Sequence, residues 1–367
     1  MTSPHVVIVG ASGLVGRAVL QHFVEHGYKV TTVSRRKPEN TYGASWASLD
    51  LTDADACQKV LSPLTDVVQL IFAAVQEEPN VVAGWLEQKQ IERNGAMMRN
   101  TVEAIVPNAH SLKNITIFQG VKAYGLHVHP IRYGAREDID EDRSIANFYW
   151  LQEDYLKERQ KGQKWSWNVL RVGLVVGLSV GSSLNLYGVI GVYAAIFKER
   201  GEPLYYPNEG AAFNQQTDSD LIAEACEWCL RDPRARNQCY NLDNGDSLVG
   251  LKDDWRVIAE ALGMEAGPVK QFSFITDFPS LSEEWDIVRE KHKLKAPALD
   301  AFVGASAPFT EYVMTYGPGG TMPVSLTGTM SCIKIRRHGF TKTVYAEEMI
   351  RKWFKKYQDE HLLPAAA

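Results

Sequence analysis

Several features that mark other classes of protein are scarce or missing in this sequence. The 367 residues include only five cysteines, and their odd, scattered set (Cys57, Cys226, Cys229, Cys239 and Cys332) argues against a secreted disulfide framework. No window approaches 18 uninterrupted apolar residues, and the N-terminus has no basic stretch followed by a long apolar region. We therefore expect reduced thiols, no signal peptide, no membrane span and a cytoplasmic location.

An excess of basic residues is also missing. The formal net charge is -5, whereas a polyanionic partner normally requires a basic surface. Hydrophobic residues at 45% and charged residues at 23% are ordinary for a globular protein. We expect a small-molecule partner, with neither nucleic acid nor membrane; a homodimer stays open.

Residues at metal-ligand spacing are few. Cys226 and Cys229 form a C-x-x-C, but they lie in residues 220–232, whose apolar periodicity predicts a helix buried on one face. Since no second Cys or His pair stands at the required spacing, we predict no metal site and no redox role.

The first 180 residues alternate between strand and helix patterns. The β-branched run at 6–10 precedes a helical pattern at 16–30, and strand-like runs recur at 30–34, 67–75, 114–120 and 167–177. The intervals are long enough for crossover helices, as a parallel sheet requires. The fold class predicted is α/β, with a Rossmann-type doubly wound parallel sheet and an interleaved, smaller C-terminal substrate lobe.

Beyond residue 180 this alternation loosens. Helix-like segments at 185–200 and 220–232 and a short strand at 238–244 suggest a lobe over 181–367, with some segments returning to the first domain of 1–180. Residues 265–330 are rich in Phe, Pro, Ser and Gly, and we expect an irregular section there that covers a ligand. Residues 345–363 form an amphipathic helical pattern.

A glycine-rich turn joins the first strand to its helix. Gly10, Gly13 and Gly16 form G-x-x-G-x-x-G, which lets the backbone turn tightly and approach a pyrophosphate at a helix N-terminus. The alternative is a turn that needs glycine only for packing. The residues expected at the cofactor in this turn are Gly10, Ser12, Gly13, Leu14, Val15 and Gly16.

Basic residues follow the second strand, where an NAD-binding protein often presents an acid to the adenosine ribose. Ser34, Arg35 and Arg36 stand there instead, and arginine can pair with the oxygens of a 2′-phosphate. This pattern favours NADPH/NADP+ as the cofactor. By position, Asp50 and Leu51 would contact the adenine, although Asp50 could equally cap the following helix.

The next strand ends in small residues. Ala73, Ala74 and Val75 would pass beneath the cofactor.

No Y-x-x-x-K pair, the usual catalytic pattern of short-chain dehydrogenases, stands at the expected place. Lys122 follows the strand at 114–120, and Tyr149 lies about 25 residues later, so the two could meet in space. Taken alone, Tyr149 could be an aromatic anchor between Phe148 and Trp150, and Lys122 a surface lysine.

These segments resemble the progesterone 5β-reductase/iridoid synthase-like family, an atypical branch of the extended short-chain dehydrogenases/reductases. The family patterns are T-G-x-K-H-Y, which 119–124 follows in part, and N-F-Y-Y-x-x-E-D, which 147–154 matches closely. Segments at 10–16, 34–36, 170–208, 217–225, 240–246 and 338–340 also have family counterparts. The resemblance therefore runs nearly the whole chain.

The resemblance implies NADPH-dependent reduction of a carbon-carbon double bond conjugated to a carbonyl. Tyr149 would hydrogen-bond the carbonyl oxygen and stabilise the enolate, and Lys122 would hold the nicotinamide ribose and lower the pKa of the phenol. By family position, Gly120, Val176 and Ser183 would also border the cofactor. Residues expected in the substrate pocket are Tyr124, Asn185 and Phe340, although Asn185 could instead cap a helix and Phe340 could belong to the core.

The chain departs from the family pattern at three points. Ala123 stands for histidine, Gln119 for threonine, and residues 125–130 read GLHVHP where the family has Gly-Pro-Phe. We expect these changes on the substrate side of the nicotinamide. Three alternatives stay open: 1,2-reduction of a carbonyl, a non-catalytic NADP-binding regulator, and epimerase or dehydratase chemistry, which is weakened because Glu153, not lysine, lies four residues after Tyr149.

Overall fold

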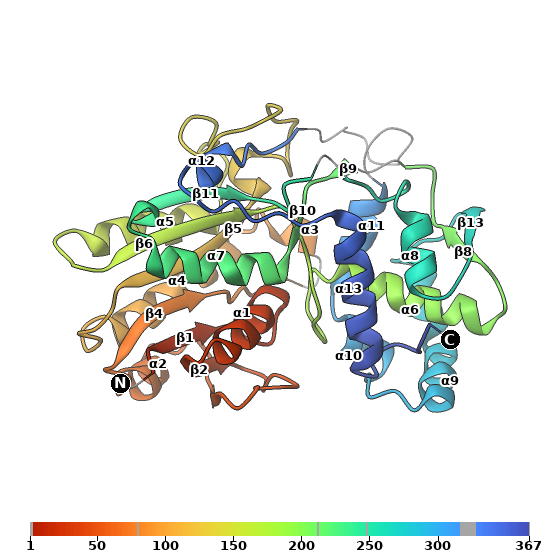
Figure 1. Ribbon diagram of the computed structural model, residues 1–367, viewed down its shortest axis with the longest axis horizontal. Coiled ribbons are helices and arrows are strands. Elements are labelled where there is room, and N and C mark those ends of the chain that lie inside the picture. Colours follow the sequence, from red (N-terminus) through yellow and green to blue (C-terminus); the bar gives the residue numbers. More distant parts are fainter. Residues whose placement is uncertain (1–2, 79–80, 211–212, 247–248, 316–327, 367) are drawn as a thin grey trace.

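The computed structural model describes residues 3–78, 81–210, 213–246, 249–315 and 328–366. A seven-stranded parallel sheet with its covering helices occupies the left of Figure 1, and a mainly helical lobe occupies the right. The strand order is β11-β6-β5-β4-β1-β2-β3. The strands are β1 His5–Val9, β2 Lys29–Ser34, β3 Ser45–Ser48, β4 Val67–Phe72, β5 Asn114–Gly120, β6 Ser166–Val172 and β11 Gln238–Leu242.

Both faces of the sheet are covered by helices. On one face α1 (Leu14–Glu25) packs against α7 (Ser219–Arg231); on the other, α4 (Gln88–Ile105) packs between α2 (Ala54–Leu61) and α5 (Phe148–Gln160). The central strands are therefore apolar on both sides, as continuous β-branched runs predict. This is the predicted doubly wound Rossmann-type arrangement.

The second lobe has its own apolar core. Its main helices are α6 Leu186–Glu199, α8 Trp255–Ala261, α9 Ser282–His292, α10 Leu299–Val303, α11 Ser306–Thr315 and α13 Ala346–Asp359. Helix α6 is buried nearly all round, which explains its apolar sequence, whereas α13 buries one stripe beside a charged face, as its amphipathic pattern predicts. Although they follow residue 180, β11 and α7 belong to the sheet and its covering layer.

Short elements complete the described chain. Three small sheets pair β7 (Leu174–Val176) with β10 (Gln216–Asp218), β8 (Leu204–Tyr206) with β13 (Ala266–Val269), and β9 (Phe213–Asn214) with β12 (Val249–Gly250). The remaining short helices are α3 Val81–Gly84, η1 Val121–Tyr124, η2 Pro233–Ala235, η3 Phe278–Leu281 and α12 Ile333–Arg337.

The expectation of an irregular section over 265–330 is partly wrong. Residues 299–315 form α10 and α11, because apolar residues such as Phe302 and Val313 are spaced to pack on the lobe core. Pro308 is tolerated in the first turn of α11, where a backbone N–H has no intrahelical partner. The Gly- and Pro-rich stretch 316–325 lies outside the described residues.

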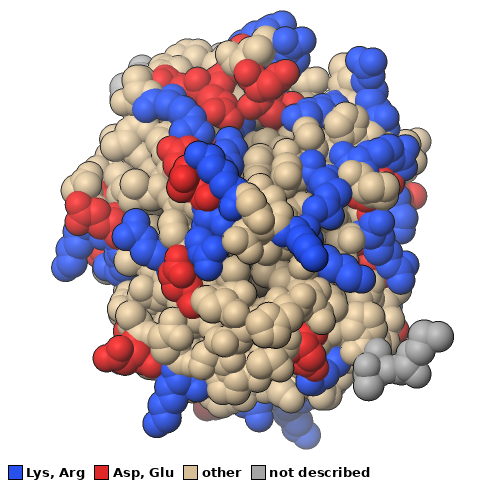
Figure 2. Space-filling view, turned by 90° about the vertical axis from the view of Figure 1, so that its left-hand side faces the viewer, with Lys and Arg blue, Asp and Glu red and all other residues tan. Residues whose placement is uncertain are grey.

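The surface carries both signs of charge. Lys and Arg side chains lie beside Asp and Glu over the upper part of the face in Figure 2. This face therefore offers no uniformly basic surface of the kind that binds a polyanion. Within the described ranges, no helix combines the length and the apolar character that crossing a membrane demands.

Candidate active site

Two adjoining cavities lie at the carboxyl ends of the sheet strands. The first, which we call the glycine cleft, has a volume of about 260 Å³; the second, the tyrosine cavity, measures about 280 Å³. They share walls at Val15, Ala73, Ala74, Val75, Val175 and Leu184, so they join between β1 and β4. Here the strand order reverses, which is where open α/β sheets bind their ligands.

The glycine turn is shaped for close backbone approach. Gly10 has a φ of +90°, and a Cβ there would lie 2.7 Å from the backbone of Ala73 and Ala74. A Cβ on Gly16 would lie 2.2 Å from the Gly10 carbonyl oxygen, so this glycine lets α1 pack on the turn without bordering the cleft itself. Gly13 is the N-cap of α1, and no side chain there competes for the free N–H groups. The turn leaves a helix N-terminus open toward an anion.

The residues expected around the cofactor mostly line the glycine cleft. They are Gly10, Ser12, Gly13, Leu14, Val15, Ser34, Arg35, Arg36, Asp50, Leu51, Ala73, Ala74, Val75 and Ser183. Gly120 lines the tyrosine cavity instead.

The two arginines after β2 differ in their partners. Arg36 donates to the carbonyl oxygen of Gly181 at 2.9 Å, which ties this turn to the second lobe. Arg35 is exposed at the cleft, near enough to Asp50 to help lower the pKa of that carboxyl. The larger cause is hydrogen bonding from Thr52, whose N–H lies 2.9 Å from Asp50 Oδ1. Asp50 does not cap α2, because Asp53 is the N-cap.

Tyr149 and Lys122 come together on the wall of the tyrosine cavity. Asn147 caps α5 by accepting a hydrogen bond from the N–H of Tyr149, and this places the tyrosine in the first turn. Lys122 lies on η1, directly after β5. Its Nζ lies 5.5 Å from the centroid of the Tyr149 ring. Two segments separated in sequence thus present a phenol and an ammonium group to one space.

The charge states of this pair are set by burial. Burial lowers the pKa of Lys122 from 10.5 to about 8, although Glu77 opposes the shift. Burial raises the pKa of Tyr149 well above its ordinary value; a contact with the Gly120 backbone and the charge of Arg171 oppose this shift. Lys122 is not among the groups that lower the pKa of Tyr149, so the expectation that it holds the phenol pKa down is wrong for the protein alone. The phenol is a neutral hydrogen-bond donor at neutral pH.

A buried network of hydrogen bonds and ion pairs contacts the backbone of Tyr149. Gln119 Nε2 donates to the backbone oxygen of Tyr149 at 3.3 Å and to Glu153 at 2.9 Å, while its Oε1 accepts from Arg171 Nε at 2.8 Å. Arg171 also pairs with Glu153 at 3.2 Å and with Glu141 at 2.5 Å. Gln119, which departs from the family pattern, thus links β5 and β6 to α5.

Ala123 is fully buried against Phe148, Tyr149 and Trp150. This departure therefore affects the packing of α5, not the cavity wall.

Two residues expected in the substrate pocket are structural. Asn185 is the N-cap of α6: its Oδ1 accepts from Gly188, and its Nδ2 donates to Tyr357 at 2.8 Å. Phe340 packs in the core beneath the sheet, 5.7 Å from the ring of Trp228. The expectation that both line the substrate pocket is therefore wrong. Asn185 caps a helix and Phe340 belongs to the core, which are the alternatives given from the sequence.

Two further expectations are wrong for similar reasons. The Tyr124 hydroxyl donates to Asn241 at 2.5 Å and faces β11. Val176 is buried in the core of the second lobe. Neither borders the cavities that the described residues form, because η1 and β7 each turn these side chains away.

Several cavity residues were not anticipated from the sequence. Trp85 and Phe148 flank the lysine, with ring centroids 4.3 and 5.6 Å from Lys122 Nζ. His127 and Gln152 also line the tyrosine cavity, as do Phe309, Tyr312 and Val313 of α11. The GLHVHP departure was a signal for His127; nothing local marks Trp85 or α11.

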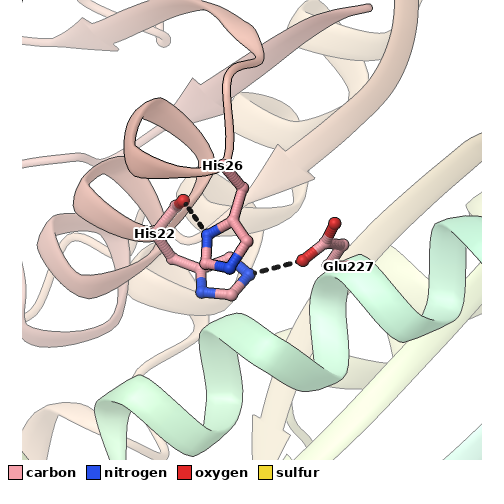
Figure 3. A group of neighbouring side chains, drawn as sticks. All are labelled: His22, His26 and Glu227. Carbon is pink, nitrogen blue, oxygen red and sulfur yellow. Dashed lines mark hydrogen bonds and ion pairs between the residues drawn. The ribbon is translucent and has the colours of Figure 1, made fainter.

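A histidine pair lies elsewhere, at the C-terminal end of α1 (Figure 3). His22 Nε2 and Glu227 Oε2 are 2.7 Å apart, and His26 Nδ1 lies 2.7 Å from the His22 backbone oxygen. The two imidazole rings stack at 4.0 Å. These bonds account for the arrangement, which borders neither of the cavities formed by the described residues, and we assign it no metal role.

Comparison with known proteins places this architecture in a family. Residues 6–242 match the NAD dependent epimerase/dehydratase family. A 3-oxo-Delta(4,5)-steroid 5-beta-reductase from Arabidopsis thaliana is 34% identical over 71% of this chain and 69% of its own. An (S)-8-oxocitronellyl enol synthase from Nepeta racemosa is 30% identical over 98% of this chain and 91% of its own.

The fold is also found among solved structures. UDP-glucose 4-epimerase from Thermotoga maritima superposes with a TM-score of 0.67 at 15% identity, covering 97% of this chain and 99% of its own. At that identity the likeness shows the fold alone. The sequence matches are closer. They agree with the Rossmann-type sheet, the glycine turn and the N-F-Y motif of α5. The chain therefore belongs to the NAD dependent epimerase/dehydratase family and, within it, to the progesterone 5β-reductase/iridoid synthase-like branch.

Proposed function

We propose that this protein is an NADPH-dependent reductase of α,β-unsaturated carbonyl compounds. The observation that carries the proposal is the position of Tyr149 and Lys122 on a largely apolar cavity that opens into the glycine cleft. A dinucleotide in the cleft and an enone or enal in the cavity would meet where the two spaces join. The named relatives, a steroid 5β-reductase and an enol synthase, make this reaction class the natural one to test.

The residues of the glycine cleft fit a phosphorylated dinucleotide. The turn at Gly10 and Gly13 offers free backbone N–H groups to a pyrophosphate. Arg35 is the better candidate for a 2′-phosphate, because the guanidinium of Arg36 is already bonded to Gly181. When bound, NADPH supplies the hydride that the reduction requires.

Tyr149 supplies the hydrogen bond that the reaction needs. As the β-carbon is reduced, negative charge develops on the carbonyl oxygen, and a donor already in place stabilises it. The raised pKa keeps the phenol protonated, so Tyr149 can donate to the oxygen of the enolate throughout the neutral range. Lys122 adds a positive charge, whose attraction to the developing negative charge is stronger in the dry cavity than in water.

The cavity also excludes water from the reacting atoms. Apolar and aromatic side chains dominate its walls, and α11 adds Phe309, Tyr312 and Val313 from the second lobe. This environment suits an apolar enone or enal and strengthens each electrostatic contact within it.

The experiment is NADPH oxidation with a panel of enones, enals and steroid enones, followed by product identification. We expect saturated carbonyl products, with kcat lowered roughly 10²- to 10⁴-fold in Tyr149→Phe, because one positioned donor is lost. Lys122→Met should also lose activity, because it removes the cation beside Tyr149. Lys59→Met, an exposed substitution, is its matched control.

Alcohol products would move the assignment to 1,2-carbonyl reduction, which uses the same pair of side chains. Tight NADPH binding with no turnover across the panel, together with full biological effect of Tyr149→Phe, would favour a regulator instead.

A further inference from the structure

The tyrosine cavity contains polar atoms that the protein leaves unpaired. Buried side-chain nitrogens without a hydrogen-bond partner among the described residues include Nδ1 and Nε2 of His127, Nε1 of Trp85 and Nδ2 of Asn214. All three residues line this cavity. An unpaired buried polar atom costs stability, and in native proteins it usually has a reason such as a ligand.

His127 is the most unusual of the three, because both of its ring nitrogens are unpaired. Its ring lies 6.1 Å from that of Trp85, edge to face, beside the Lys122 ammonium. Burial, followed by the charges of Lys122 and His129, lowers the pKa of His127 to about 4. The imidazole is therefore neutral at neutral pH, and it offers one donor and one acceptor.

Trp85 adds a donor to the same corner. Its indole Nε1 can only donate, and the Trp85 ring also contacts Tyr312, 5.6 Å away. A neutral hydroxyl is the simplest group that can pair with both side chains, since it can donate to the bare nitrogen of the imidazole while accepting from the indole N–H. A carboxylate would leave the imidazole acceptor unpaired, and an ammonium would lie against the Lys122 charge.

We propose that His127 and Trp85 form a hydroxyl-binding subsite, and that this enzyme selects enones or enals that carry a hydroxyl group away from the reacting carbonyl. The inference rests on the proposed function, whose Tyr149 binds the carbonyl. His127 acts here as a specificity-determining residue and takes no part in the reduction itself.

The test uses pairs of linear 2-enals of about six to ten carbons, each with and without a terminal hydroxyl, so that chain length scans the distance to the subsite. At the matching length we expect kcat/KM for the hydroxylated enal to exceed that of its parent roughly 10-fold or more, because a paired hydroxyl satisfies buried donors and acceptors. His127→Leu should abolish this preference by raising KM for the hydroxylated enal, leaving the parent within about threefold of wild type.

Two further variants separate the subsite from general damage. His127→Gln keeps one donor and one acceptor and should restore part of the preference. His110→Leu changes an exposed histidine and should leave the preference intact. Trp85→Phe should lower it, since the ring remains but the N–H is lost.

Equal kcat/KM within every pair would overturn the subsite while leaving the proposed reductase activity in place. Weakened NADPH binding in His127→Leu, with no change in preference, would also overturn it. If none of these linear enals is reduced, the subsite needs a test that is independent of turnover, and the proposed function is judged on the wider panel of enones and steroid enones. The subsite is then tested by titrating 1-octanol and 1,8-octanediol in the presence of NADP+: a wild-type preference for the diol that is lost in His127→Leu supports it, and no such loss refutes it.

Discussion

Replacing Lys122 by methionine should make the protein more stable and inactive. The pKa of Lys122 falls from 10.5 to about 8 because the ammonium lies in a desolvated cavity, and this corresponds to about 3 kcal/mol of cost to folding at neutral pH. The cation–π contact of the ammonium with Trp85, at 4.3 Å, offsets only about 1 kcal/mol of this cost, and the variant loses it. Methionine fills a similar volume without charge, so we expect a net gain of about 2 kcal/mol.

The gain in stability of Lys122→Met should depend on pH. Because the pKa of Lys122 is lower in the folded than in the unfolded chain, the cost is complete below pH about 8 and disappears as the pH approaches 10.5. The advantage of Lys122→Met should therefore be largest at pH 7 and fade above pH 8. Urea denaturation of the protein without cofactor measures it, with Lys59→Met as the exposed control. A variant that is destabilised by more than about 1 kcal/mol would refute the reasoning, since that is a sizeable fraction of total stability.

Four other substitutions test the glycine turn, the two arginines after β2 and the core position of Phe340. Gly10→Ala should abolish NADPH binding, measured by tryptophan quenching, because the added Cβ meets backbone 2.7 Å away. Arg35→Ala should weaken NADPH binding roughly 10-fold and leave NADH binding unchanged, since a charge-assisted hydrogen bond to phosphate contributes about 1.5–3 kcal/mol. Arg36→Ala should affect the binding of both cofactors equally. Phe340→Leu should lower the free energy of unfolding by about 1 kcal/mol without changing KM, because the ring is in the core; a changed KM would restore it to the pocket.

The sequence predicts those features that depend on neighbours along the chain. The glycine turn, the β-branched strands and the apolar periodicity of α1 and α6 are local patterns, and each forms as expected. The N-F-Y motif likewise contains its own cap, since Asn147 fixes the first turn that carries Tyr149.

Other features depend on contacts that no local pattern records. Tyr124 and Phe340 are aromatic residues in segments that resemble the family patterns, but only the packing of β11 and α7 decides that they face the interior. The cavity walls from α11 come from the second lobe, about 160 residues after Tyr149, so spacing could not assign them. Desolvation also escapes sequence patterns: it reverses the expected pKa shift of Tyr149.

The central claim is that Tyr149 holds the carbonyl oxygen while the β-carbon is reduced. NADPH deuterated at C4, on the face that is transferred, tests it most directly when the product of an enal is examined by NMR. We predict deuterium at the β-carbon of a saturated aldehyde, and a matched loss of rate in Tyr149→Phe. Deuterium at the carbonyl carbon of an allylic alcohol would contradict the account.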